Sequence, residues 1–453
     1  MLRPETLESR TPLGMAGEIA RLVADGSLEP GERLPTVREI AATLGVSAGT
    51  VAAAWRALAD AGTIVSRGRA GTFVRTEPRE WLSPRVQVMT SPGGPRRVEP
   101  VRLDLSHGTP DPAMLPALED AFTRVAPRAD TGRYHDLPVL PELHAHISET
   151  WPAPGVETFT VVDGALDGIS RTLEQVARFG DRVAVESPGF PYFFDLLEAL
   201  GAEPVPLALD RDGVTTGSLA RALARKPAAV ILQPRSQNPT GISMTPERAR
   251  ALAQVIMNAP DGRRVTIIED DHSALISSAP DVTLARWVPN QVVHVRSFSK
   301  SHGPDLRIAA LGGPARVVDR LVARRMLGPG WTSRLLQTVL LDLLTDPGPV
   351  ARVRTARLIY RDRLDSMATA LRRFGVDVGD PDGINLWVPV VDERAARMRL
   401  AASGIAVSAG SPYRAPTDDV TTPHIRVTAG ALTANVRLVA EALAEAAEAP
   451  PVG

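Results

Sequence analysis

The sequence has 453 residues and no cysteine, so disulfides, thiolate metal sites and a cysteine nucleophile are excluded. No apolar run reaches ~18 residues, and the N-terminus lacks a signal-like apolar stretch. We therefore expect a cytoplasmic protein with no membrane contact and no metal site. The net charge is only −1, so no overall field attracts nucleic acid. Any nucleic-acid binding must come from a local surface.

Lysine is also scarce: of 51 lysine and arginine residues, only Lys226 and Lys300 are lysines. Arginine stays protonated and is a poor nucleophile, whereas a lysine amine can lose its proton when its pKa is lowered. Lys300 lies in a small polar loop after the apolar run Val292–Val295, where an α/β enzyme holds a Schiff-base lysine. A leftover surface lysine is the alternative, and Lys226 fits that alternative well.

Residues 1–77 show the pattern of a small separate domain. Helical periodicity predicts helices at Pro12–Asp25, Thr36–Leu44 and Ser47–Asp60, with Ser47 as the N-cap of the third. Alternating residues at Thr63–Ser66 and Thr72–Arg75 predict a hairpin. Three helices followed by a two-stranded wing indicate a winged helix-turn-helix.

The remainder of the chain predicts a linker and an α/β domain. Residues 78–101 are rich in proline and glycine with little periodicity, as in a linker. From residue 102 to 453, short apolar strands alternate with helices, which predicts a mostly parallel sheet. The stretch from about residue 350 has helices around strands at Asn385–Val388 and Ile425–Val427, and predicts a smaller α+β lobe.

A helix-turn-helix places its second helix in the major groove, with neighbouring groups on phosphates. Ser47 and Thr50 at the start of that helix can reach base edges or phosphates of the DNA. Arg38, on the preceding helix, faces the DNA backbone. Arg67 and Arg69 lie at the predicted wing tip. A protein-interaction module with solvated arginines is the alternative on these residues alone.

The amino-acid sequence of this domain resembles that of GntR-type regulators. The segment Leu28–Ala41 carries the match, which continues through Leu44–Ser47 and Gly71–Val74. The resemblance implies binding to double-stranded DNA. Ala48-Gly49 stands where the family usually has Arg and Asn, so a common DNA-contacting arginine is missing.

A second set of residues could bind pyridoxal phosphate. A phosphate needs backbone N–H donors at a helix start, hydroxyls and an arginine. The candidates are Gly164, Ala165, Ser297, Ser299 and Arg307.

The cofactor ring needs further partners. A buried carboxylate keeps the ring nitrogen protonated, and Asp270 ends a predicted strand. Asn238 can donate to the 3′-oxygen, and Arg426 can hold a substrate carboxylate. Each residue alone has an alternative: a turn for Asn238, a structural carboxylate for Asp270 and a salt bridge for Arg426.

In this order the segments resemble fold-type I aminotransferases over residues 102–449, most specifically in Ser-Phe-Ser-Lys at 297–300 with Arg307 beyond it. The resemblance implies Lys300 as the lysine that forms the internal aldimine. It assigns the ring nitrogen to Asp270, the 3′-oxygen to Asn238, the phosphate to Gly164, Ala165, Ser297 and Arg307, and a ligand carboxylate to Arg426. It also places Phe190 near the ring, and Tyr134 near the phosphate of a neighbouring subunit.

The chain departs from the aminotransferase pattern near the cofactor. His272 replaces a tyrosine that touches the 3′-oxygen, and its titration would make cofactor spectra pH-sensitive. The alternative is that His272 is a structural residue near the end of the strand, with its ring nitrogens hydrogen-bonded within the protein. His144 and Val139 replace a family arginine and glycine, so the fold near Tyr134 is expected to differ.

Together the two domains resemble the MocR-type regulators of the GntR family. The resemblance implies a head-to-tail homodimer that binds DNA and senses an amine or amino acid as an external aldimine. The alternative is an active aminotransferase with a retained DNA-binding domain. A third possibility is a pyridoxal phosphate sensor governing vitamin B6 synthesis, which needs no carboxylate site such as Arg426.

Overall fold

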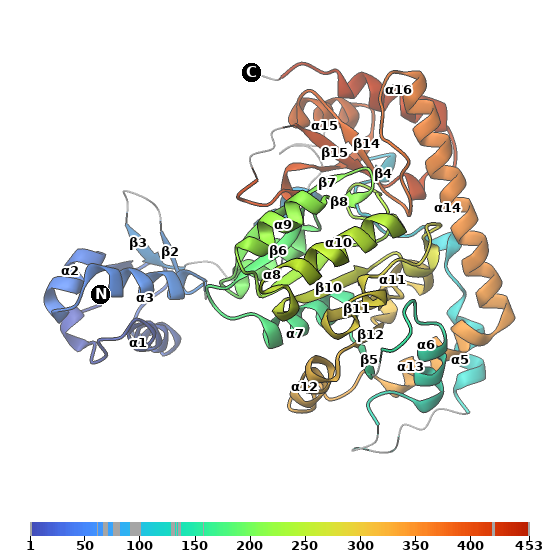
Figure 1. The fold of residues 1–453 in the computed structure, drawn as a ribbon. Coiled ribbons are helices and arrows are strands. Elements are labelled where there is room, and N and C mark those ends of the chain that lie inside the picture. The colour runs from blue at the N-terminus through green and yellow to red at the C-terminus, as the bar shows by residue number, and fades with distance from the viewer. Residues whose placement is uncertain are drawn as a thin grey trace. The chain divides into compact units, whose positions relative to one another are not determined.

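The computed structural model describes residues 2–451 except 61, 67–70, 76–81, 91–100, 128–131, 133, 135–136, 157 and 419–421. The chain divides into two compact units, residues 1–83 and 84–453 (Figure 1). Among the helices of these described ranges, none is long and apolar enough to cross a membrane.

The N-terminal unit has three helices and a small antiparallel sheet of order β1-β3-β2. Its elements are α1 (Pro12–Ala24), β1 (Arg33–Leu34), α2 (Val37–Leu44), α3 (Ala48–Asp60), β2 (Ile64–Ser66) and β3 (Thr72–Val74). Helices α1 and α3 pack together around a core that includes Met15, Ile19, Val51 and Leu58. The predicted winged helix-turn-helix is confirmed, with no boundary shifted by more than one residue.

Local capping explains where α2 and α3 begin. Thr36 and Glu39 form a capping box at α2: the Thr36 hydroxyl accepts from the Glu39 N–H at 3.2 Å, and the Glu39 carboxylate accepts from the Thr36 N–H at 2.6 Å. Gly45 ends α2 in the left-handed region, with φ 64°. The Ser47 hydroxyl accepts from the Thr50 N–H at 3.0 Å, as expected of an N-cap.

Part of the predicted linker is a helix. Helix α4 (Pro84–Thr90) belongs to the C-terminal unit, with Val86 and Met89 buried one turn apart. The Arg85 side chain forms an ion pair with Asp195 at 3.3 Å, and the Ser408 hydroxyl donates to the Met89 carbonyl at 3.1 Å. The linker prediction was therefore wrong for residues 84–90, because a helix of 7 residues, or about two turns, is too short to show clear periodicity.

The C-terminal unit is built on an eight-stranded sheet of order β5-β12-β11-β10-β9-β6-β7-β8. Strands β12 and β8 run antiparallel to their neighbours, and the other pairs among β11, β10, β9, β6 and β7 are parallel. The strands are β5 (Thr158–Val162), β6 (Arg182–Ser187), β7 (Glu203–Asp210), β8 (Gly213–Val214), β9 (Ala229–Leu232), β10 (Thr266–Asp271), β11 (Val292–Ser297) and β12 (Ala309–Gly313). The mostly parallel sheet agrees with the prediction.

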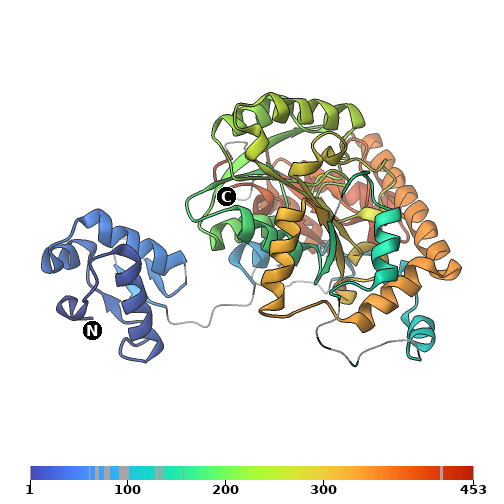
Figure 2. The same cartoon turned by 60° about the horizontal axis from the view of Figure 1, so that its bottom comes forward.

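Helices cover both faces of this sheet (Figure 2). One face packs against α7 (Ala165–Val176), α8 (Pro191–Ala199) and α12 (Ala315–Met326). The other face packs against α9 (Thr216–Ala224) and α10 (Pro246–Asn258), and, near β5, against α5 (Leu118–Val125), α6 (Pro141–Glu149) and α13 (Arg334–Thr345). Because the sheet is covered on both faces, its strands are mostly apolar, and the charged residues on β10 and β11 are buried.

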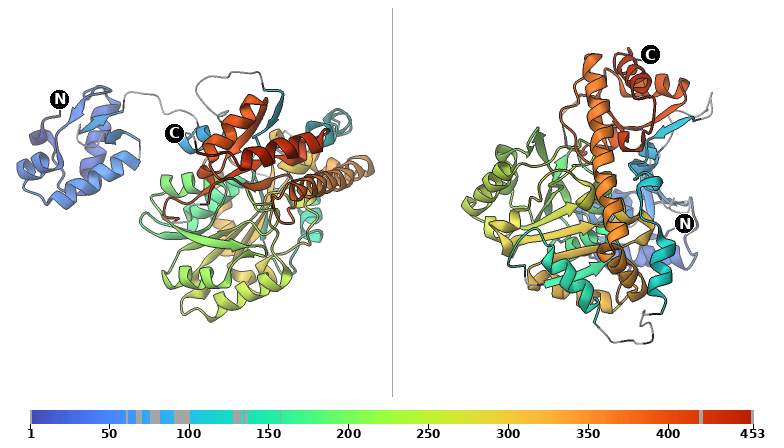
Figure 3. Two further views of the ribbon diagram at one scale, coloured as in Figure 1. Left: turned by 90° about the horizontal axis from the view of Figure 1, so that it is seen from above. Right: turned by 90° about the vertical axis from the view of Figure 1, so that its right-hand side faces the viewer.

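The long helix α14 (Pro347–Arg373) runs from the large sheet to a smaller lobe (Figure 3). This lobe has a four-stranded sheet of order β13-β15-β14-β4. Its elements are β4 (Leu103–Leu105), β13 (Leu386–Pro389), α15 (Glu393–Ala402), β14 (Ile405–Ala409), β15 (His424–Val427) and α16 (Val436–Ala447). The predicted lobe also includes β4, which comes from the start of the domain and pairs in parallel with β14.

Candidate functional site

Lys300 lies in the short helix α11 (Ser299–His302), directly after β11. Its Nζ donates to the carbonyl of Gly108, on the loop that follows β4. Burial and, to a smaller extent, the nearby charge of Arg426 lower the pKa of Lys300 to about 8, although Asp270 opposes the shift. The amine is therefore easier to deprotonate than an exposed lysine, as a nucleophile requires.

Asp270, on β10, is buried with one free oxygen. Its Oδ2 accepts from Nε2 of Gln233 at 2.8 Å, whereas its Oδ1 has no partner among the described residues. Burial raises the pKa of Asp270 to about 7, and Lys300 is close enough for its charge to oppose that shift. An unpaired buried acceptor is costly unless a ligand supplies the donor.

Arg426, on β15 of the small lobe, is 1% exposed and lies at the same site as Lys300 and Asp270. Its Nη2 donates to the Ser106 carbonyl, its Nη1 lies 3.5 Å from Oδ1 of Asn238, and its Nε has no partner among the described side chains. The guanidinium lies 5.3 Å from the centre of the Tyr413 ring. A Cβ on Gly108 would lie 2.7 Å from Nη1, so only glycine fits beside Arg426.

Asn238 lies in the loop after β9 and is also tied to Gln233. The Asn238 N–H donates to Oε1 of Gln233 at 2.9 Å. Lys300, Asp270, Asn238 and Arg426 are thus linked through direct contacts, shared partners or mutual charge effects, although they are far apart in sequence.

A second group of predicted residues meets at the end of β5. Gly164, with φ 98°, precedes the first turn of α7, which begins at Ala165. A Cβ on Gly164 would lie 2.5 Å from Nη2 of Arg307, and this atom donates to the Asp163 carbonyl at 3.0 Å. The helix start and the exposed arginine therefore lie side by side, as an anion site requires.

The two serines before Lys300 contact each other. The buried Ser297 hydroxyl accepts from the Ser299 N–H at 3.2 Å. β11, which ends at Ser297, and β5 share β12 as a neighbour, so both ends lie on the same edge of the sheet.

His272 follows β10 and is held in the neutral form. Burial, together with the charge of Lys300, lowers its pKa to about 4. One ring nitrogen, Nε2, lies 2.9 Å from the Ser236 carbonyl and must carry the hydrogen there, while Nδ1 lies 3.3 Å from the Ser273 hydroxyl. Both nitrogens thus have partners, in agreement with the structural alternative for this residue.

The two predicted aromatic residues lie on separate elements. Phe190 precedes α8 and is partly buried against the rings of Tyr192 and Phe193, at centroid distances of 5.2 and 5.4 Å. Tyr134 is 79% exposed and meets Trp331 edge to face at 6.2 Å.

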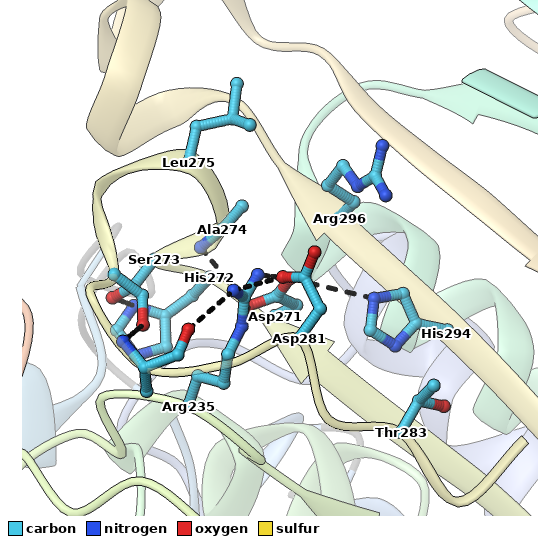
Figure 4. A network of polar contacts seen from close by, with 12 residues as sticks. Arg235, Asp271, His272, Ser273, Ala274, Leu275, Asp281, Thr283, His294 and Arg296 are labelled. Atoms are coloured by element: carbon cyan, nitrogen blue, oxygen red, sulfur yellow. Dashed lines mark hydrogen bonds and ion pairs between the residues drawn. The ribbon is translucent and has the colours of Figure 1, made fainter. Parts of the chain in front are cut away.

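A charged network involves β10, the strand that carries Asp270, and β11, the strand that precedes Lys300 (Figure 4). Asp271 accepts from Arg235 at 2.6 and 3.2 Å and lies 3.7 Å from Nε2 of His294. His294 also contacts Glu269 at 2.8 Å. Among the described residues, no group of three or more His, Asp or Glu side chains is arranged to hold a metal ion.

The network gives neighbouring carboxylates different properties. Burial opposes ionisation of Asp271, but Arg235 and His294 outweigh it and lower the pKa of Asp271 far below its usual range. Burial likewise opposes the charged form of His294, yet its contacts with the carboxylates of Asp271 and Glu269 raise its pKa. Asp271 is thus fully paired within the protein, whereas Asp270 keeps an oxygen free.

The sequence did not indicate Gln233, Glu186 or the His294 network. Gln233 follows β9 with no motif of its own, although it lies five residues before Asn238. Glu186, near the end of β6, is 3% exposed, and burial raises its pKa to about 8. The sequence signal that could have indicated Gln233 and Glu186 is a carboxylate or amide side chain at the end of an apolar strand.

The proposed DNA-contacting residues are only partly described. Arg38 on α2 and Ser47 before α3 are exposed, and Thr50 is partly exposed in the first turn of α3. Arg67 and Arg69 lie outside the described residues.

Comparison with known families identifies both units. Residues 101–443 match the family model "Aminotransferase class I and II", and residues 14–74 match "Bacterial regulatory proteins, gntR family". The protein PtsJ of Salmonella typhimurium, named a vitamin B6 salvage pathway transcriptional repressor, is 36% identical over 411 residues, covering 90% of this chain and 92% of that protein. The chain belongs to the MocR-type regulators of the gntR family.

Other relatives match this MocR-type regulator over most of its length. MocR of Rhizobium meliloti, a probable rhizopine catabolism regulatory protein, is 28% identical over 83% of this chain and 78% of its own. PdxR of Corynebacterium glutamicum, a pyridoxine biosynthesis transcriptional regulator, is 29% identical over 78% of this chain and 77% of its own.

Solved aminotransferases share the fold of the C-terminal unit. The kynurenine aminotransferase of Pyrococcus horikoshii has a TM-score of 0.69 with 18% identity, covering 81% of this chain and 95% of its own. LysN of Thermus thermophilus, an α-aminoadipate aminotransferase, has a TM-score of 0.67 with 20% identity, covering 81% and 98%. The predicted fold-type I aminotransferase fold is confirmed.

Proposed function

We propose that this MocR-type regulator binds double-stranded DNA through its N-terminal unit and pyridoxal phosphate in its C-terminal unit. The observation that carries the cofactor assignment is Asp270: a buried carboxylate whose Oδ1 lacks a partner, next to a lysine whose pKa is lowered. Asp271, one residue on, is saturated and offers no such acceptor.

The described residues fit this cofactor. Lys300 would attach to it covalently, Asp270 would accept from the ring nitrogen and Asn238 would donate to the 3′-oxygen. Gly164 leaves room beside Arg307 at the start of α7, where the phosphate would bind together with Ala165, Ser297 and Ser299. When bound, pyridoxal phosphate supplies an aldehyde that reacts with amines and a ring that withdraws electrons.

The ligand class follows from Arg426. A buried guanidinium with a free Nε, next to Asn238 and Lys300, favours a ligand that carries both an amine and a carboxylate. We therefore propose an amino acid as the sensed ligand. Its effect on DNA binding must be differential, because a ligand shifts an equilibrium only by its preference for one state.

The names of two relatives support a second candidate, in which pyridoxal phosphate itself is the signal. PtsJ and PdxR are named for vitamin B6 salvage and pyridoxine biosynthesis. Arg426 has no role in this candidate, since the cofactor phosphate would lie at Gly164 and Arg307.

A working aminotransferase is the third candidate, because Lys300, Asp270, Asn238 and Arg426 are all present. The gntR unit and the relatives named as regulators favour regulation over metabolism as the main role. We further propose a head-to-tail homodimer, in which the exposed Tyr134 would face the partner's phosphate site.

One titration separates the three candidates. Purified full-length protein is mixed with pyridoxal phosphate, and then with a panel of amino acids and their decarboxylated amines, while cofactor absorbance, released keto acid and affinity for the gene's own upstream DNA are measured. Sensing of an amino acid requires a stable absorbance change and altered DNA affinity without keto acid. A DNA response to pyridoxal phosphate alone favours the vitamin B6 candidate, and stoichiometric keto acid release favours the enzyme.

A further inference from the structure

Gln233 hydrogen-bonds two residues that are predicted to contact the cofactor, Asp270 and Asn238. It follows β9, in the middle of the sheet between β6 and β10, and is 3% exposed. Its side chain bonds Asp270 on one side and the Asn238 backbone on the other, at 2.8 and 2.9 Å. No family motif indicated this residue.

Chemistry fixes the orientation of the Gln233 amide. The Asn238 N–H is a donor only, so the atom facing it must be the carbonyl oxygen Oε1. The NH₂ group then faces Asp270, where a carboxylate oxygen accepts. A flipped amide would set donor against donor and acceptor against acceptor, so this arrangement needs no further assumption.

The consequence concerns the free oxygen of Asp270. Because Gln233 occupies Oδ2, the carboxylate is held with Oδ1 as its remaining buried acceptor. The charged or titratable groups around Asp270 are Glu186 on β6, Asp271 on its own strand, His294 on β11 and Lys300 after β11. Among these surroundings Gln233 supplies a neutral donor, which orients the carboxylate without neutralising it.

We propose that Gln233 is a positioning residue for the cofactor: its amide holds Asp270 with Oδ1 free for the ring nitrogen and holds the Asn238 loop in reach of the 3′-oxygen. This inference rests on the proposed binding of pyridoxal phosphate. It differs from a purely structural role, because loss of the Gln233 donor should change the protonation of the cofactor ring and not only the stability of the fold.

The test uses full-length protein loaded with pyridoxal phosphate labelled with ¹⁵N in the ring, whose chemical shift reports the ring proton. Gln233→Met keeps the side-chain length but removes both bonds, so Asp270 should favour its neutral form. We expect the ring nitrogen to lose its proton near neutral pH, and the dissociation constant for pyridoxal phosphate to rise about tenfold or more, as for a lost bond to a charged group.

A rescue variant and a matched control keep the test specific. Gln233→Glu introduces a carboxyl that, sharing one buried proton with Asp270, supplies the same donor, and at pH 6 it should retain the protonated ring. Gln291→Met removes another buried glutamine, whose Nε2 bonds the Gly262 and Val265 carbonyls at 2.6 and 3.0 Å, before the start of β11 and away from Asp270. It should lower the melting temperature without moving the ¹⁵N signal.

The outcomes separate this inference from the function on which it rests. If the wild type binds no pyridoxal phosphate, the proposed function fails. If the wild type binds it with a protonated ring, and Gln233→Met leaves both ring proton and affinity unchanged, the inference about Gln233 alone is overturned. Equal effects of Gln233→Met and Gln291→Met would also overturn it, because they would show a general loss of packing.

Discussion

At the scale of single residues, the site depends on how the protein treats groups of the same kind differently. The chain has two lysines, and the partly buried one has its pKa lowered to about 8, while Lys226 is 76% exposed and pairs with Asp261 at 3.2 Å. Two adjacent aspartates differ in the same way: Asp271 is saturated by Arg235, and Asp270 keeps an acceptor free. Burial and partner choice, rather than residue type, determine which group can react.

Lys300→Ala should abolish covalent attachment of pyridoxal phosphate. Borohydride reduction of the loaded wild type, followed by peptide mass mapping, should place the label on Lys300, and the variant should lose it entirely. Lys226→Ala is the matched control and should be labelled like the wild type. Label at Lys226 would move the assignment to that residue.

The rate of attachment should depend on pH in a defined direction. Burial lowers the pKa of Lys300 to about 8, so below that pH the amine is protonated and cannot attack an aldehyde. The attachment rate should therefore rise through about pH 8 and level off above it. Stopped-flow absorbance in the full-length protein measures this profile, and a midpoint beyond pH 10 would contradict the lowered pKa.

Arg426→Ala should weaken amino-acid binding by roughly 2–5 kcal/mol, because truncation leaves the ligand carboxylate unpaired in a buried place. Binding of the corresponding decarboxylated amine should change far less. Arg399→Ala, on the surface of the same lobe, is the control and should affect neither ligand. Equal losses for acid and amine in Arg426→Ala would mark the residue as structural.

At the scale of elements, periodicity predicted most of the fold. Strand β15 (His424–Val427) was predicted one residue short, and the three helices of the N-terminal unit were each predicted within one residue of their observed limits, because apolar patterns and caps give strong local signals. Helix α4 was missed, since its two buried residues, Val86 and Met89, make one turn in a segment rich in proline and glycine. Contacts such as Gln233 with Asp270 depend on strand order in the sheet, which periodicity does not encode.

Docking of α4 gives an element-scale prediction. Val86 is 1% exposed, so Val86→Asp would bury an unpaired charge, at a cost of several kcal/mol that undocking avoids. Hydrogen exchange of the amides in residues 84–90 should speed up about tenfold or more. Val88→Asp lies on the same helix but at a 46% exposed position and should exchange like the wild type. Similar exchange in both variants would contradict the docking of Val86.

At the scale of the whole molecule, sensing requires coupling between the two compact units. If an amino acid changes DNA affinity by some factor, DNA must change amino-acid affinity by the same factor, because the coupling is reciprocal. Helix α4 begins the C-terminal unit and is bonded within it through the Arg85 side chain and the Met89 carbonyl. The segment before it, within residues 76–81, lies outside the described residues.

Specific DNA binding is the prediction that decides the regulatory role. Ala48-Gly49 lacks the usual arginine contact, so affinity should depend mainly on phosphates and fall steeply with salt. Arg38→Ala, at an exposed position on α2, should weaken binding to the gene's upstream region and to random duplex alike if Arg38 contacts only phosphate, and should also reduce specificity if it reaches a base. Arg21→Ala, exposed on α1, is the matched control and should bind like the wild type. Fluorescence anisotropy with random duplex as competitor measures both the affinity and the sequence specificity of DNA binding. If the wild type shows no preference for its upstream region at moderate salt, with or without pyridoxal phosphate and amino acids, regulation through DNA is excluded and the aminotransferase candidate takes its place.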